Sequence, residues 1–173
     1  MIEIFEILKY ILPSLVVFFT AYLLINKFIN NDQQKRKQEI ILNNQKIITP
    51  IKLQAYERLI LFLERISAES LIIRIQQQGM TSKQLHIGLL STIRAEFEHN
   101  ISQQLYVSPQ AWELLKASKE NMIKLINDCA VNTNPKSPSI ELSRTIIERV
   151  METSKSPTSV AIVFLKKEMS DVF

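Results

Sequence analysis

The sequence predicts an all-α protein with an N-terminal transmembrane helix followed by a multi-helix bundle. Residues 10–25 contain no charged side chain, and basic residues follow them closely. The rest of the chain is punctuated by hydroxyl–proline pairs, which are typical of a helix N-cap followed by proline in the first turn. These pairs begin at Thr49, Ser108, Ser137 and Ser156. We therefore expect an anchor at residues 1–30, a basic juxtamembrane stalk at 31–49 and a cytoplasmic helical domain at 50–173.

The uncharged run, YILPSLVVFFTAYLLI, is interpreted as a membrane span. Its sixteen residues would extend roughly 24 Å as a helix, and apolar neighbours lengthen it toward the roughly 30 Å of a bilayer core. A cleaved signal peptide would have a basic start and a small-x-small cleavage site, and the run has neither. A buried helix of a soluble fold is the other alternative. The membrane-surface basic cluster, which we expect at the headgroups, comprises Lys27, Lys35, Arg36 and Lys37.

Charge and cysteine content indicate where the domain resides. Basic residues concentrated after the span place the N-terminus outside and the C-terminal domain in the cytoplasm. The net charge of +4 arises mainly at residues 27–52, which hold six bases and two acids. The remaining domain is nearly neutral, which argues against nucleic-acid binding. The single cysteine excludes an intrachain disulfide and favours a reducing compartment.

The first helix of the domain is predicted from Pro50 to about Ile66. Its apolar stripe has spacings of four, three and four residues, and it should be central to the bundle. The stripe comprises Ala55, Leu59, Phe62 and Ile66. Residues 71–75, LIIRI, are expected as a short helix after Ser67 that ends at Gly79. Upstream, Asn30, Asn31 and Asp32 have poor helix propensity and are the expected weak point of the stalk.

A third helix is predicted from Ser82 to Leu105, with a capping box at Thr81 and Gln84. It contains Glu96-x-x-His99, the spacing by which di-iron bundles place two ligands on one metal. With Phe97 at the centre of the core face, however, Glu96 and His99 project outward. The sequence also lacks a second such motif. We therefore predict a polar surface cluster and no metal, and we expect His86 to be a hydrogen-bonded core histidine.

Three more helices complete the predicted bundle. The first runs from Pro109 to about Ala130, and its core face includes Cys129 as a small buried side chain. Residues 132–138 form a loop. The next helix, Pro138 to about Glu152, should place Ile140, Ile147, Val150 and Met151 inward and pair Arg144 with Glu148 outward. The last begins at Pro157 and contains VAIVFL, a run that propensity alone would assign to a strand.

The residue inventory argues against several enzyme classes and predicts no cofactor. Two glycines cannot build a phosphate-binding loop or a dinucleotide fingerprint. One cysteine and two histidines supply no zinc set of Cys or His ligands. No Gly-x-Ser-x-Gly elbow presents a nucleophilic serine. The sequence therefore predicts no recognisable catalytic site.

Two functional hypotheses stay open. The first is a membrane-anchored interaction, scaffold or accessory-subunit protein whose partners are the lipid bilayer and another protein, with a homo-oligomer possible as well. The second is a helical-bundle enzyme that uses an unrecognised carboxylate site, with or without a metal. For the first, the candidate partner surface combines a polar helix face with the apolar C-terminal run. The residues are Glu96, His99, Gln103 and Ile162.

Three segments carry a resemblance to a known family. They are TPIKLQAYERL at 49–59, RAEFEHN at 94–100 and QQLYVS at 103–108. Together they resemble a family of uncharacterised bacterial single-span membrane proteins with a cytoplasmic helical domain. The resemblance extends over nearly the whole chain. It implies an anchor plus a helical domain and no known activity.

Overall fold

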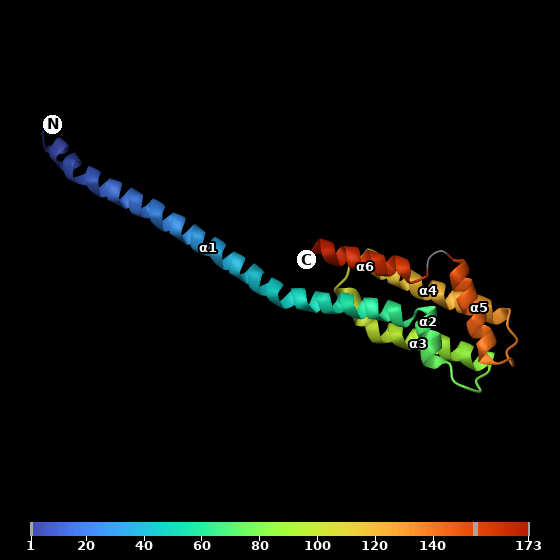
Figure 1. Ribbon diagram of the computed structural model, residues 1–173. Helices are drawn as coiled ribbons and strands as arrows, with labels where there is room; N and C mark the ends of the chain where they lie inside the picture. The colour runs from blue at the N-terminus through green and yellow to red at the C-terminus, as the bar shows by residue number, and fades with distance from the viewer. Residues whose placement is uncertain (1, 154–155, 173) are drawn as a thin grey trace. The chain divides into compact units, whose positions relative to one another are not determined.

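The protein is all-α, as the sequence predicted. The computed structural model describes residues 2–153 and 156–172, and the side chains of residues 2–12, 14 and 172 lie outside that description. The described elements are shown in Figure 1. In chain order they are α1 (Ile2–Arg65), α2 (Ala68–Ile75), α3 (Ser82–Asn100), the 3-10 helix η1 (Ile101–Leu105), α4 (Pro109–Val131), α5 (Ser139–Glu152) and α6 (Ser159–Val172).

The chain divides into two compact units, Met1–Thr49 and Pro50–Phe173. The described residues of the first unit are helical throughout, including Asn30, Asn31 and Asp32, so the predicted weak point is not a break. Asp32 instead supports the helix by accepting a hydrogen bond from Arg36 Nε, four residues later, at 3.0 Å. The use of this unit as anchor and stalk stays a prediction.

A search of the described residues finds no helix with the length and apolarity needed to cross a bilayer. Four members of the predicted span have side chains outside the described residues. They are Tyr10, Ile11, Leu12 and Ser14.

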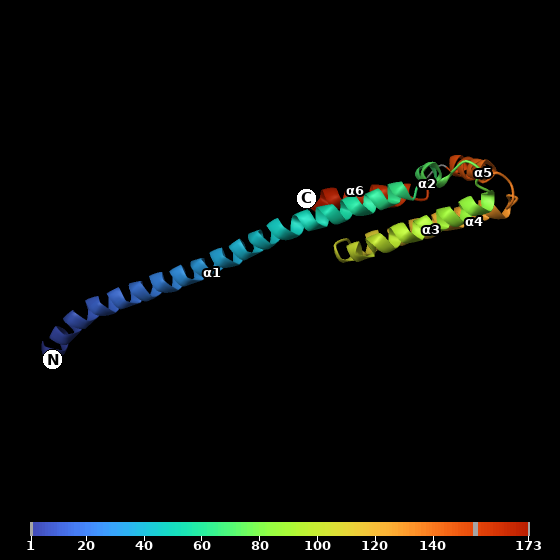
Figure 2. The same cartoon turned by 90° about the horizontal axis from the view of Figure 1, so that it is seen from below.

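The second unit is a two-layer bundle. Figure 2 shows α3 and α4 in one layer, and α6 with the last turns of α1 in the other. Helices α3 and α4 pack on each other, and α6 packs on α4. Helix α5 crosses α3 and α4 at one end, where it also contacts α2 (Figure 1). At Gly88 of α3, an added Cβ would lie 2.9 Å from Ile75 Cγ2, so the absence of a side chain lets α2 approach closely.

The C-terminal turns of α1 lie at the centre of the core. The predicted stripe is confirmed: Ala55, Leu59, Phe62 and Ile66 are all buried. The predicted core face of α4 is confirmed as well, at Ala111, Leu115, Met122, Ile126 and Cys129.

An aromatic group links three of the core helices. The rings of Phe62 on α1 and Phe97 on α3 lie 6.1 Å apart, and Phe97 stacks on Trp112 of α4 at 5.5 Å. Lys119 Nζ lies 4.1 Å from the centroid of the Phe97 ring and covers its outer side.

The predicted helix starts are correct in one case of four. Ser108 caps α4 by accepting a hydrogen bond from the Ala111 N–H at 3.1 Å. Thr49 and Pro50 lie inside α1, so this pair does not begin a helix, and the proline leaves the helix without one backbone N–H. Helix α5 starts at Ser139 because the Ser137 carbonyl is held by the Ser82 N–H, at 2.8 Å.

Two further boundaries differ from the prediction. Helix α6 starts at Ser159, two residues after Pro157, and the Ser159 N–H donates to the Ser156 carbonyl at 3.0 Å. Helix α3 ends at Asn100, and the predicted remainder is the 3-10 helix η1. The helical assignment of VAIVFL is confirmed, with Ala161 and Leu165 buried.

The predicted inward face of α5 is correct for two residues and wrong for two. Ile147 and Val150 are half-buried and pack against the core, whereas Ile140 and Met151 are exposed. Serines occupy the contact face because small side chains let α5 lie close to its neighbours. That face comprises Ser139, Leu142, Ser143 and Ile146. Arg144 and Glu148 are exposed as predicted, but the ion pair that α5 forms joins Arg149 and Glu152 instead.

Candidate partner-binding surfaces

A groove lies between α2 and the start of α5. Helix α2 ends at Ile75, and the chain then turns through Gly79, whose φ of +80° favours glycine. Two backbone hydrogen bonds fasten this turn to the loop before α5. The Ser82 N–H donates to the Ser137 carbonyl at 2.8 Å, and the Ser139 N–H donates to the Met80 carbonyl at 2.9 Å. The walls of the groove are therefore held by backbone geometry.

The groove has a volume of about 680 Å³, and its lining combines apolar side chains with glutamine amides. Ile73 is 81% exposed and Ile140 is 56% exposed, so the lining includes two large apolar side chains that remain in contact with solvent. Lys136 is the charged residue of the lining. The other lining residues are Ile72, Gln76, Gln77, Gln78, Gly79, Met80, Thr81, Pro138 and Ser139.

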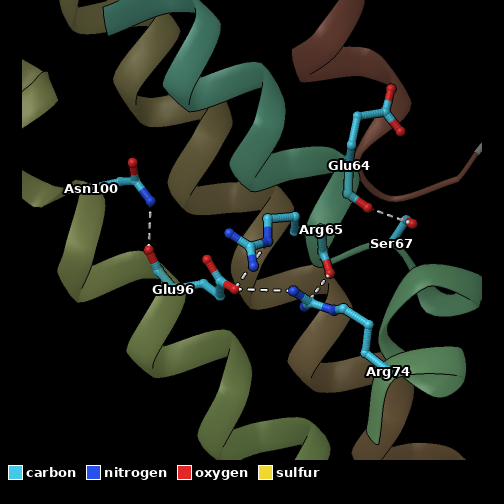
Figure 3. Close-up of polar contacts among 6 residues, drawn as sticks. All are labelled: Glu64, Arg65, Ser67, Arg74, Glu96 and Asn100. Atoms are coloured by element: carbon cyan, nitrogen blue, oxygen red, sulfur yellow. Dashed lines mark hydrogen bonds and ion pairs between the residues drawn. The ribbon is translucent and has the colours of Figure 1, made fainter.

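Glu96 joins three helices rather than pointing into solvent. Its Oε1 lies 3.3 Å from Arg65 Nε of α1 and 3.2 Å from Arg74 Nη1 of α2 (Figure 3). Arg74 Nη2 also donates to the Arg65 carbonyl at 2.9 Å, which satisfies a free acceptor at the end of α1. Only 17% of the Glu96 side chain is exposed. The predicted outward orientation of Glu96 is therefore wrong, because two arginines from other elements turn it inward.

The other members of the predicted partner surface are spread over the bundle. His99 is exposed on α3, as predicted, and Gln103 is half-buried in η1. Ile162 of α6 is half-buried, packs against the core and lines a hollow of about 400 Å³ with Val150 and Val163. The role of His99, Gln103 and Ile162 in partner binding stays a prediction.

A second carboxylate, Glu168 of α6, is held at the start of α4. Its Oε1 accepts hydrogen bonds from Tyr56 Oη at 2.6 Å and from the Ser108 N–H at 3.1 Å. Its Oε2 accepts from Ser108 Oγ at 2.8 Å. A carboxylate at a helix N-terminus is favoured by the helix dipole. Burial of Tyr56, its hydrogen bond to Glu168 and the Glu168 charge, in that order, raise the pKa of Tyr56 well above its ordinary value.

The surroundings of His86 and Cys129 are those of structural side chains. His86 is half-buried on α3, with Nε2 2.8 Å from Asn127 Oδ1, so the predicted hydrogen bond is present. It lines a small cavity of about 210 Å³ with Lys83 and Thr133. Burial raises the pKa of the Cys129 thiol, with Arg149 lowering it and Asp128 raising it by smaller amounts. A buried thiol of this kind is a weak nucleophile.

The described residues contain no group of three or more His, Cys, Asp or Glu side chains placed to hold a metal ion. Glu96 is occupied by two arginines, and His99 points elsewhere from an exposed position. In the first unit, the side chains of Lys27, Lys35, Arg36 and Lys37 are exposed on α1.

Sequence reasoning missed the groove and both carboxylate networks. The exposure of Ile140 could have been predicted, because rotating the predicted buried face of α5 by one residue places Ile140 outward with Met151. Glu168 carried none, because its partners come from segments 60 and 112 residues away in the chain.

The fold and these surfaces define a class of protein. It is a helical bundle, preceded in the chain by a long helix, with apolar grooves and with polar side chains that join helices. The chain belongs to a family of unknown function (DUF7935), whose model matches residues 2–172. Membership of an uncharacterised family, expected from the resemblance, is thus confirmed. Comparisons with curated proteins and with solved structures find no match.

The Glu96 cluster yields a stability prediction. Glu96→Ala should lower the free energy of unfolding of the full-length protein by about 1–2 kcal/mol, because it removes two partly buried ion pairs. Urea unfolding measures the loss, and high salt should reduce it. The exposed Glu98→Ala is the matched control and should change stability by less than about 0.5 kcal/mol. Equal losses for the two variants would contradict this role of Glu96.

The Tyr56–Glu168 contact yields a pH prediction. A folded-state pKa raised above the ordinary value of 10.0 gives stability that is complete below about pH 10 and is lost as the pH rises further. Tyr56→Phe should cost about 1.5–3 kcal/mol at pH 8, and its difference from the wild type should shrink above pH 10. Unfolding measured at several pH values tests this. Tyr106→Phe, at an exposed tyrosine, is the control. A gap for Tyr56→Phe that stays constant up to pH 11 would contradict the prediction.

Proposed function

We propose that this protein is a single-pass membrane-anchored interaction module, a scaffold or accessory subunit of a bacterial inner membrane. Its helical domain lies on the cytoplasmic side and binds another protein through the groove between α2 and α5. The observation that carries the proposal is the pair of exposed isoleucines, Ile73 and Ile140, lining one groove.

The sequence supports the membrane anchor. Sixteen uncharged residues, mostly large and apolar, are followed by the basic cluster of Lys27, Lys35, Arg36 and Lys37. Basic residues on one side of a span orient it with that side in the cytoplasm and interact with anionic headgroups there.

The groove supports protein binding. Exposed apolar patches with a polar rim mark interaction sites more often than plain surface. Here the isoleucines would supply buried apolar area, and the exposed amides of Gln77 and Gln78 would pair with polar groups of the partner. Lys136 is the one charged lining residue, so a partner loses little through desolvation of charge.

The environment of the polar side chains supports an interaction role as well. Among the described residues, no buried side-chain nitrogen or oxygen lacks a hydrogen-bond partner. Glu96 and Glu168, the carboxylates held by several donors, are occupied in joining helices. The groove, by contrast, is lined by the exposed Ile73 and Ile140, and one side-chain hydrogen bond crosses it, from Gln76 Nε2 to Ser139 Oγ at 3.1 Å.

Membrane topology is the first test. A reporter that is active only in the cytoplasm, fused after Phe173, should be active on the wild-type chain, and the protein should stay with membranes after a carbonate wash. Replacing Lys35, Arg36 and Lys37 by glutamine should reduce reporter activity, because the charge difference that orients the span is weakened. A protein that washes off would overturn the proposed anchoring. An inactive cytoplasmic reporter, together with activity of a periplasm-specific reporter fused at the same position, would overturn the proposed orientation.

Partner capture is the second test. Tagged full-length protein, solubilised from membranes, should recover a specific partner, and Ile73→Lys should lower that recovery at least tenfold, which corresponds to about 1.4 kcal/mol. Met151→Lys is the matched control, because Met151 is 77% exposed and lies outside the groove lining. Both variants should melt like the wild type. Equal recovery by Ile73→Lys and Met151→Lys would show that the groove is not the binding surface.

A further inference from the structure

The first unit carries an apolar stripe between Ile40 and Ile48. Ile40, Ile41, Ile47 and Ile48 are exposed on α1 and form two pairs that are seven residues apart. At ~100° per residue, all four isoleucines lie within about 60° of Asn44 on the helix surface. We call this surface, residues 40–48, the isoleucine stripe.

The charged residues of this segment lie away from the stripe. Glu39 and Lys46 are about 140° and 160° from Asn44, on the opposite side of the helix together with Leu42. Lys37 is one heptad before Asn44 and therefore ends the uncharged surface on that side. From Ile40 to Ile48 the stripe consists of four isoleucines around one amide.

This arrangement fits a second helix of the same sequence better than a lipid surface. Apolar pairs repeated every seven residues meet the same pairs of a parallel partner, as in a coiled coil. An asparagine at the centre can donate and accept, so two copies of Asn44 satisfy each other and fix the register. On a lipid surface the same amide would be buried without a partner, which is costly.

We propose that residues 40–48 form a short parallel coiled-coil contact between two copies of this chain. The inference rests on the proposed anchor, which would orient both copies in the same direction in one membrane. Two turns of helix give little affinity for free chains, but confinement to a membrane raises the effective concentration of each copy for the other.

Disulfide cross-linking in membranes tests the contact. The full-length protein with Cys129→Ser receives either Asn44→Cys, at the centre of the stripe, or Leu42→Cys, on the opposite side at a similarly exposed position. After mild oxidation, Asn44→Cys should give a covalent dimer in at least fivefold greater yield than Leu42→Cys. Adding Ile48→Lys to the Asn44→Cys chain should remove most of that dimer, because it places like charges at the contact.

The controls separate this inference from the proposed function. The contact would be overturned by equal yields at positions 42 and 44, by the absence of a dimer at 44 in membrane-bound protein, or by a band containing a different protein. None of these results would contradict the anchor. Recovery of the chain in the soluble fraction would overturn the anchor. In that fraction, a dimer specific to position 44 would support the contact without the anchor, and its absence would overturn both, because the contact depends on confinement to a membrane.

Discussion

Burial of the last turns of α1 is the interaction on which the second unit depends. Leu59, Phe62, Leu63 and Ile66 are almost completely inaccessible to solvent. Each such side chain contributes about 1.5–3 kcal/mol when buried, so the four together are comparable to the 5–15 kcal/mol net stability of a typical domain. Without them, Phe97 would lose the ring that it contacts on α1. The bundle therefore includes these turns as an integral helix.

Two carboxylates connect helix ends that the apolar core alone would leave loosely joined. Glu168 accepts hydrogen bonds at the N-terminus of α4, where the helix dipole is positive. Glu96 holds Arg74, and Arg74 in turn caps the C-terminal carbonyl of α1, where the dipole is negative. Glu168 and Arg74 thus lie where they stabilise helix termini, and these contacts explain why Glu168 and Glu96 are half-buried.

The sequence predicted helices whose buried face is apolar and failed where that face is not. The stripe from Ala55 to Ile66 was found because its members recur at helical spacing. The face of α5 was missed because Ser139 and Ser143 are buried there and a search for apolar residues passes over them. The helix cap predicted at Ser137 was wrong because the Ser137 carbonyl accepts a hydrogen bond from the Ser82 N–H. This contact depends on the tertiary fold and not on the local sequence.

The groove could not be predicted because it exists only after α2 and α5 are brought together. Two backbone hydrogen bonds fix its walls, so its shape is set before any partner arrives. A preformed surface spends little binding free energy on ordering its own loops, and more of the buried apolar area then contributes to affinity. Ile73 and Ile140 leave water only when something else fills the groove, and this is the physical reason for proposing an interaction role.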